Sequence, residues 1–370
     1  MSRRAERLEG WAGRLGLLVL SSLLAVGLAE VLCRQFVSVG SFHWQGDAGD
    51  SWSEQDQELG YRLKAGWRGW LEAPEYRHRV EINSRGFRGE EPGAEPAVWM
   101  LGDSFVFGVG VEAKDSLPGR LEAELAGGSL KVPVWNLGVP SWSGEQYRRE
   151  LERRFADARP AAVVVVFFLG ERTSGANDLI GAQDFLLELG ARASRPIPAA
   201  ESEPPPKLES LKKWLGRHSA LYNAIVSRFG PGLRGLVRRH SEMEPEERER
   251  IEKGWLLLDE ELRRFAAFAS REGVPFLVVA MPEVGDLARG DSPVGRRFLD
   301  LAEKAGLPAV DLSPALTQQP FGEISYSRDG HLKPEGNRVA AVAIAGAFAG
   351  SASVPPAPEI EEWAGRPRSR

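Results

Sequence analysis

Residues 162–169 form an apolar run, Ala-Val-Val-Val-Val-Phe-Phe-Leu, in which no side chain is polar. A strand of this kind is typical of the centre of a parallel sheet, because helices cover both faces of such a sheet. Strand-like runs alternate with helical patterns on either side of it. Strands are expected at 97–101, 132–137, 161–169, 274–281 and 308–312, and helices near 117–125, 144–155, 295–305 and 334–348. This alternation predicts an α/β fold with a parallel five-stranded sheet.

Three segments flank or interrupt the alternating pattern. Residues 35–96 are rich in Trp, Gly, Glu and Arg and contain short alternating stretches, so a β-rich lead-in is expected there. Between 171 and 270 the pattern lapses, which predicts a mainly helical insertion that closes with a long amphipathic helix. The sheet domain is expected to span 97–350, followed by a flexible tail at 351–370. The apolar positions of the long helix are Ile251, Trp255, Leu258, Leu262, Phe265 and Ala269.

The N-terminal segment resembles a membrane anchor. Residues 15–33 are apolar except for Glu30 and small polar serines, and their length is about that of a bilayer-spanning helix. Four arginines precede the run, which predicts a cytoplasmic N-terminus and a periplasmic catalytic domain in a single-pass protein of a bacterial inner membrane. Residues 1–34 are therefore expected to form a cytoplasmic tip and a transmembrane helix. A cleaved signal peptide, or a lipoprotein signal ending at Cys33, are the alternatives; Leu32 is too bulky for the latter.

Composition excludes several classes of function. The formal net charge of −5 argues against a nucleic-acid-binding surface, which needs a concentrated basic face. The single cysteine, Cys33, has no partner within the chain for a disulfide, and the five histidines lack metal-ligand spacing. The sequence predicts neither a metal nor a cofactor.

Two short motifs, far apart in the chain, carry the candidate chemistry. Gly102-Asp103-Ser104 follows the strand at 97–101, which places a serine hydroxyl at the carboxyl edge of the sheet, where open parallel sheets bind ligands. Asp329-Gly330-His331 supplies a base and an orienting carboxylate. Together they suggest hydrolytic acyl transfer. Taken alone, Gly102–Ser104 is equally a turn with a helix cap, and His331 is equally a histidine at a helix entry.

Four blocks in order resemble the SGNH hydrolases, also called the GDSL family. They are Gly102–Ser104, Asn136–Gly138, Gly175–Asp178 and Asp329–His331. The flanking segments 59–63, 83–89, 102–111 and 329–336 look like a membrane-anchored bacterial branch of that family. The resemblance covers roughly residues 55–348 and implies a flavodoxin-like, three-layer SGNH hydrolase fold.

The resemblance also implies a role for each matching residue. Ser104 would be the nucleophile, His331 the general base and Asp329 the residue that orients the imidazole. A serine hydroxyl needs such a base, because it is a weak nucleophile while protonated. The oxyanion hole would use the backbone N–H groups of Ser104 and Gly138 and the side-chain amide of Asn177.

The chain departs from the family pattern at two places. Residues 171–174 separate the third strand from Gly175-Ala176-Asn177-Asp178, so either a short insertion precedes Asn177 or its role is lost. The common family spacing is Asp-x-x-His, whereas this chain has Asp329-Gly330-His331 with Arg328 at the usual acid position. The shorter spacing occurs in related acyl-transfer proteins of envelope polysaccharides, so Asp329 is kept as the orienting acid.

The expected function is a membrane-anchored serine esterase that removes acyl groups, acetyl among them, from a carbohydrate or envelope polymer. An O-acyltransferase would use the same triad and the same acyl-serine. A non-catalytic binding or assembly factor for envelope polysaccharide is the hypothesis from another class, motivated by the altered third block. A lipase or thioesterase would need an apolar cleft; Trp142 could line one, but it is expected to pack in the core or a loop.

Overall fold

The structure is a computed structural model. It describes residues 43–93, 96–128, 131–170, 245–283, 293–327 and 329–350, together with most of helix 14–33 and residues 219, 221 and 222. The chain divides into two units, of which one comprises Met1–Ser41 and Pro198–Glu242 and the other Phe42–Ile197 and Met243–Arg370. The second unit carries the sheet and both motifs.

The central sheet has five strands, all paired in parallel, in the order β10-β9-β8-β6-β7. The α/β prediction and its five strands are confirmed. The chain enters at β6, pairs β7 on one side and then crosses to β8 on the other, so its direction of travel reverses at β6. Ligands bind outside the carboxyl ends of strands at such a reversal. The strands are β6 (Val98–Gly102), β7 (Val134–Gly138), β8 (Ala162–Leu169), β9 (Phe276–Pro282) and β10 (Ala309–Asp311).

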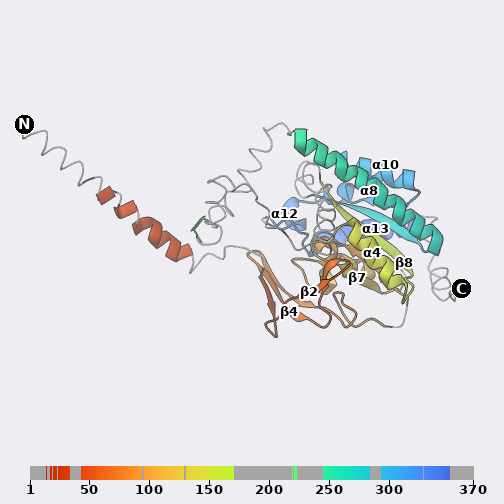
Figure 1. Cartoon of the computed structure of the whole chain (residues 1–370), viewed down its shortest axis with the longest axis horizontal. Helices are drawn as coiled ribbons and strands as arrows, with labels where there is room; N and C mark the ends of the chain where they lie inside the picture. Colours follow the sequence, from red (N-terminus) through yellow and green to blue (C-terminus); the bar gives the residue numbers. More distant parts are fainter. Residues whose placement is uncertain are drawn as a thin grey trace, which may run out of the picture. The chain divides into compact units, whose positions relative to one another are not determined.

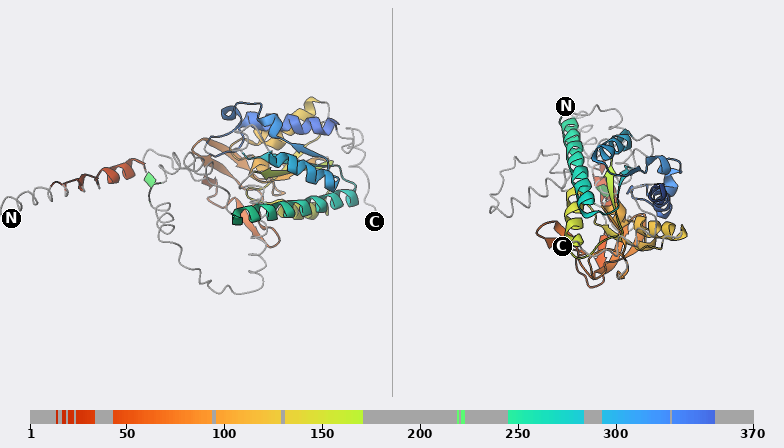
Figure 2. Two further views of the ribbon diagram at one scale, coloured as in Figure 1. Left: turned by 90° about the horizontal axis from the view of Figure 1, so that it is seen from above. Right: turned by 90° about the vertical axis from the view of Figure 1, so that its right-hand side faces the viewer.

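Helices cover both faces of the sheet, so the unit has three layers (Figure 2). Strand β8 shows why its sequence has no polar position, since Val163, Val165 and Phe167 pack into one apolar cluster and Val164 and Val166 into the other. One layer contains α4 (Gly144–Phe155), α8 (Pro245–Glu272) and α10 (Pro293–Ala305). The other contains α3 (Leu117–Gly127), α11 (Ser313–Leu316), α12 (Phe321–Ile324) and α13 (Pro334–Gly350).

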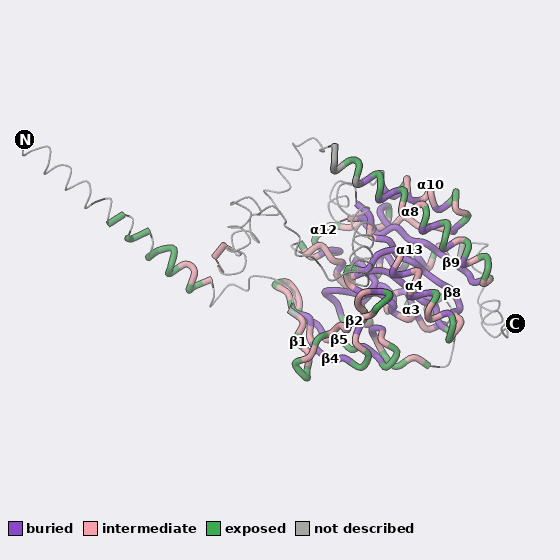
Figure 3. The backbone as a smooth tube through the Cα atoms, in the orientation of Figure 1, coloured by how far each residue is buried: buried purple, intermediate pink, exposed green. Residues whose placement is uncertain are grey.

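The long helix expected at the end of the insertion is α8, and it connects β8 to β9 across one face of the sheet (Figure 1). Buried and exposed positions alternate along α8 (Figure 3), and its residues Leu258, Leu262 and Phe265 are fully buried. The segment from 245 onward is therefore part of the sheet domain's helical layer rather than of an insertion above it. Of the expected insertion 171–270, residues 171–218, 220 and 223–244 lie outside the described residues.

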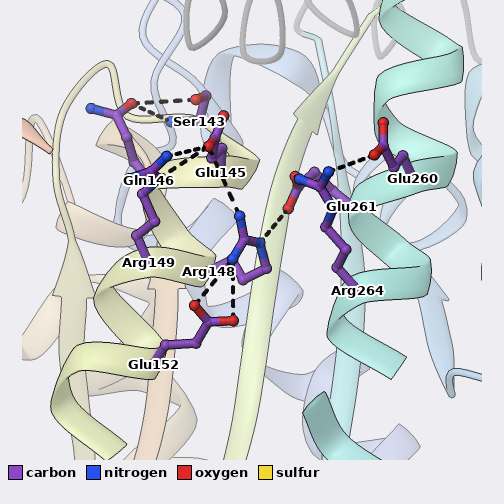
Figure 4. Close-up of polar contacts among 9 residues, drawn as sticks. All are labelled: Ser143, Glu145, Gln146, Arg148, Arg149, Glu152, Glu260, Glu261 and Arg264. Atoms are coloured by element: carbon purple, nitrogen blue, oxygen red, sulfur yellow. Dashed lines mark hydrogen bonds and ion pairs between the residues drawn. The ribbon is translucent and has the colours of Figure 1, made fainter. Parts of the chain in front are cut away.

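Charged side chains join α8 to the neighbouring helix α4 (Figure 4). Glu261 is buried, and its carboxylate accepts hydrogen bonds from Arg148 at 3.0 Å and from Arg264 at 2.7 Å. Arg148 also donates to Glu152 at 3.1 Å. A buried carboxylate without such partners would be costly, so these contacts fix how the two helices pack.

The described part of the lead-in, residues 43–93, contains five short strands in two antiparallel groups. β1 (His43–Gly46), β4 (Arg68–Ala73) and β5 (Tyr76–Glu81) form one sheet, and β2 (Ser53–Asp56) pairs with β3 (Gly60–Leu63). Trp44 stacks on Trp52 and also contacts Phe107, 5.7 Å between ring centroids. Trp142 is 1% exposed and packs edge-on against Tyr61, so it belongs to the core. The lead-in and the sheet domain share one apolar core.

The expected membrane span lies in the first unit and is only partly described. Residues 15, 16, 19 and 23 of the span, as well as the tail 351–370, lie outside the described residues. Within the described part of the chain, no helix is both long enough and apolar enough to cross a membrane. The described apolar side chains of this helix are nevertheless exposed, with Leu17 at 70% and Leu24 at 66%.

Candidate active site

Ser104 is the first residue of the short helix α2 (Ser104–Phe107), which begins directly after β6. The turn is tight, because a Cβ on Gly102 would lie 2.4 Å from the Val106 side chain. Asp103 caps α2, and its Oδ1 accepts a hydrogen bond of 2.9 Å from the Phe105 N–H. Burial raises the pKa of Asp103 to about 6. The serine therefore stands at the carboxyl end of β6, where the strand order reverses.

The structure brings Ser104, His331 and Asp329 into one chain of contacts. Ser104 Oγ lies 2.8 Å from His331 Nε2, and His331 Nδ1 lies 2.8 Å from Asp329 Oδ2. A carboxylate only accepts hydrogen bonds, so the proton belongs on Nδ1 and Nε2 is left to accept the serine proton. The side chains of His331 and Asp329 are 13% and 11% exposed, which leaves the relay largely shielded from solvent.

Asp329 and His331 can contact each other at a spacing of two residues because of the backbone conformation of Gly330. Its φ is +87°, in the left-handed region that glycine adopts without steric cost. The Gly330 N–H donates to the Tyr326 carbonyl, and the Tyr326 N–H donates to the His331 carbonyl, each at 2.9 Å. This tight turn lets side chains two residues apart face each other. Arg328 lies outside the described residues.

Two stacked aromatic rings lie on one side of the His331 imidazole. The Phe105 ring lies 4.9 Å from the His331 ring and stacks on Phe168 at 4.5 Å. Phe105 follows Ser104 in α2, and Phe168 lies near the carboxyl end of β8. The packing limits rotation of the imidazole and makes this side of the site apolar.

Of the three expected oxyanion donors, the structure describes two, Ser104 and Gly138. The Ser104 N–H lies in the first turn of α2, where N–H groups have no partner within the helix. Gly138 pairs with Gly102 at the ends of adjacent strands, but its N–H donates to Asn136 Oδ1 at 3.1 Å. A Cβ at position 138 would lie 2.2 Å from the Phe107 nitrogen, so the glycine is required for packing as well. Asn177 lies outside the described residues.

Arg88 supports the helix α2, a role that the sequence did not reveal although the residue belongs to the segment 83–89. Its buried guanidinium donates to the carbonyl groups of Phe107, Gly108 and Val111 at 2.7–2.8 Å. Burial lowers the pKa of Arg88 to about 10, so the group stays charged at neutral pH. A cation at the C-terminus of a helix satisfies its last carbonyl groups and offsets its dipole.

Two further residues missed by the sequence reach the site: Glu75 from the turn between β4 and β5, and Tyr76 from the first position of β5. The Tyr76 hydroxyl donates to Asp329 Oδ2 at 2.8 Å. Glu75 accepts hydrogen bonds from the backbone N–H groups of Ser327 and Asp329 at 3.1 and 3.2 Å. In the sequence, these residues show only a strand-like alternation.

Within the described ranges, no group of three or more His, Cys, Asp and Glu side chains could hold a metal ion.

No family model matches the chain, and no curated protein matches it. Similar solved structures include a lipase/acylhydrolase from Enterococcus faecalis, with 16% identity, a TM-score of 0.38 and coverage of 69% of this chain and 96% of that one. An α/β hydrolase enzyme from the metagenome of Lake Arreo, Spain, has 14% identity, a TM-score of 0.37 and coverage of 69% and 96%. AlinE4, an SGNH-hydrolase family esterase, has 15% identity, a TM-score of 0.30 and coverage of 59% and 77%.

Proposed function

We propose that this protein is a serine ester hydrolase of the SGNH (GDSL) type. The observation that carries the proposal is the relay Ser104–His331–Asp329, with both contacts at 2.8 Å, at the carboxyl end of the strand where the sheet order reverses. A hydrogen-bonded nucleophile, base and orienting acid is the arrangement that acyl transfer through serine needs.

The geometry gives each residue a step in the reaction. His331 Nε2 takes the proton of the Ser104 hydroxyl as Oγ attacks the ester carbonyl carbon. The Ser104 N–H supports the oxyanion, and His331 then donates the proton to the leaving alcohol. A water molecule, deprotonated by His331, releases the acid from the acyl-serine. Asp329 stabilises the imidazolium in both half-reactions.

Replacing the nucleophile tests the proposal. In Ser104→Ala, turnover of p-nitrophenyl acetate should fall by at least about 10⁴-fold, since the acyl-serine can no longer form. A fluorophosphonate probe should label the wild-type protein and fail to label the variant. The exposed Ser51→Ala is the matched control and should keep both turnover and labelling. Unchanged turnover in folded Ser104→Ala protein would overturn the proposal.

The substrate class is a prediction from the resemblance. The proposed substrate is an acylated carbohydrate or envelope polymer, and an O-acyltransferase would pass the same acyl group from Ser104 to a sugar hydroxyl instead of water. A folded wild-type protein that no fluorophosphonate labels would favour the non-catalytic binding or assembly factor.

The proposed location is the bacterial inner membrane, with the site on the periplasmic side. The support is the arginine-flanked apolar run and the exposure of its described side chains, such as Leu17, Leu24 and Leu28 at 70%, 66% and 61%. Exposed apolar groups on this scale are unfavourable in water.

A further inference from the structure

A tyrosine of the lead-in touches the carboxylate of the proposed triad. The Tyr76 hydroxyl and His331 Nδ1 each lie 2.8 Å from the same oxygen of Asp329, Oδ2. Burial and the neighbouring charge of Asp329 raise the pKa of Tyr76, so the phenol stays protonated and donates. Two donors that converge on one oxygen hold the carboxylate in a single orientation.

The tyrosine itself is held in place by its neighbours. Its ring packs against the Tyr326 ring at 4.8 Å and the His78 ring at 5.7 Å. Gly110 borders the same group, since a Cβ there would lie 2.6 Å from the Tyr326 ring and 3.3 Å from the Tyr76 ring. The Tyr326 hydroxyl donates to the Gly110 carbonyl at 2.8 Å, which ties this packing to the loop that follows the nucleophile helix.

The adjacent residue, Glu75, fixes the backbone of the same loop. Its Oε1 accepts from the Ser327 N–H at 3.1 Å and from the Ser327 hydroxyl at 2.9 Å, while Oε2 accepts from the Asp329 N–H at 3.2 Å. Asp329 is thus contacted twice from this part of the lead-in. Tyr76 contacts its carboxylate, and Glu75 contacts its main-chain N–H. A turn that depends on left-handed Gly330 benefits from such support, because glycine does not restrict its own backbone.

We propose that Tyr76 is a positioning residue, which acts through Asp329 to keep His331 aligned with Ser104. The proposal rests on the proposed serine hydrolase function. It assigns the lead-in a part in the reaction, because the triad acid receives one of its two described hydrogen bonds from outside the sheet domain.

A double-mutant cycle tests the role. In Tyr76→Phe, kcat for p-nitrophenyl acetate should fall by roughly 10- to 100-fold with KM within about twofold, as misalignment of a catalytic group affects the chemical step. In an Asp329→Ala background, the same substitution should change kcat by less than about twofold, since the group through which Tyr76 acts is gone. Tyr147→Phe is the matched control, because it removes a buried hydroxyl that donates to the Trp142 carbonyl.

The outcomes are distinct. An equal loss of kcat in both backgrounds, or a loss below about twofold in Tyr76→Phe, overturns the positioning role. Tyr147→Phe should lower the urea midpoint without the loss of kcat, so an equal kcat loss there would show a general effect of destabilisation. The midpoints of the four proteins of the cycle test the contact itself, because additive losses would contradict a Tyr76–Asp329 bond. Absent turnover by the wild type would instead overturn the proposed function.

Discussion

His78 is buried on β5 at 2% exposure, and neither ring nitrogen has a hydrogen-bond partner among the described residues. Burial, with a further contribution from the charge of Arg88, lowers the pKa of His78 to about 3. The folded protein therefore keeps this imidazole neutral where the unfolded chain would protonate it. The residue makes the folded state sensitive to acid at a position next to Tyr76.

The pH dependence of stability should reveal this histidine. Below pH 6.5, the ordinary pKa of histidine, His78 binds a proton in the unfolded chain but stays neutral in the folded state. The free energy of unfolding therefore decreases as the pH falls toward about 3. The slope is about 1.4 kcal/mol per pH unit. His78→Leu should remove that slope, measured as the free energy of urea unfolding at several pH values between 6.5 and 4.

Asp103 makes the free energy of unfolding increase as the pH falls, because its pKa is raised to about 6 and the folded state binds the extra proton. The test is therefore the difference between the wild type and His78→Leu, in which the Asp103 contribution cancels. Parallel curves for the two proteins would contradict the burial of a neutral His78.

At the scale of elements, α8 shows what a long amphipathic pattern does in this fold. Its buried face covers the sheet between β8 and β9, and its residues Leu258, Leu262 and Phe265 have no exposed surface. On the opposite face, Leu256 is 70% exposed. Two leucines of one helix thus sit in opposite environments.

This pair gives a matched test of packing. Leu262→Ala should lower the free energy of unfolding by about 2–5 kcal/mol, because it removes buried apolar surface and leaves a cavity. Leu256→Ala makes the same chemical change at an exposed site and should stay within about 0.5 kcal/mol of the wild type. Urea unfolding measures both, and equal effects would show that α8 does not cover the sheet as described.

At the scale of the whole molecule, the lead-in and the sheet domain belong to one core. Trp67, Leu71 and Val80 of the lead-in share an apolar cluster with Phe107 and Val165. The lead-in also supplies Arg88 to the end of α2 and Tyr76 to Asp329. The sequence presents residues 35–96 as a separate module, whereas in the structure Arg88 and Tyr76 of this segment contact the elements of the candidate site.

The proposed membrane location is also a property of the whole chain. Full-length protein should sediment with membranes, resist extraction by carbonate and dissolve in detergent, because an apolar helix is held by the bilayer. Replacing Leu17, Leu20, Leu24 and Leu28 by Gln should release it. Wild-type protein that stays in the soluble fraction without detergent would overturn the location.

Local patterns sufficed for the strands and for the three residues of the relay. Apolar runs place β6, β8 and β9, because a parallel strand that helices cover on both faces needs apolar side chains. β7 and β10 each carry a polar residue, Asn136 and Asp311, and are placed by their position in the α/β alternation. The motifs mark Ser104, Asp329 and His331 because few residue types can serve as nucleophile, base and orienting acid. Apolar residues at helical spacing likewise predict the long helix α8, because one of its faces is buried. They do not predict that α8 belongs to the helical layer of the sheet domain.

Only the tertiary structure decided which groups surround the relay. Arg88 donates to the carbonyl group of Gly108 at the end of α2, and Tyr76 reaches an acid more than 250 positions away in the chain. Such contacts join residues with no fixed spacing, so no sequence period reports them. The sequence determined the strands and the candidate nucleophile, base and acid, since both depend on local chemistry. The folded chain alone determined how those side chains are held, since that depends on which distant segments meet.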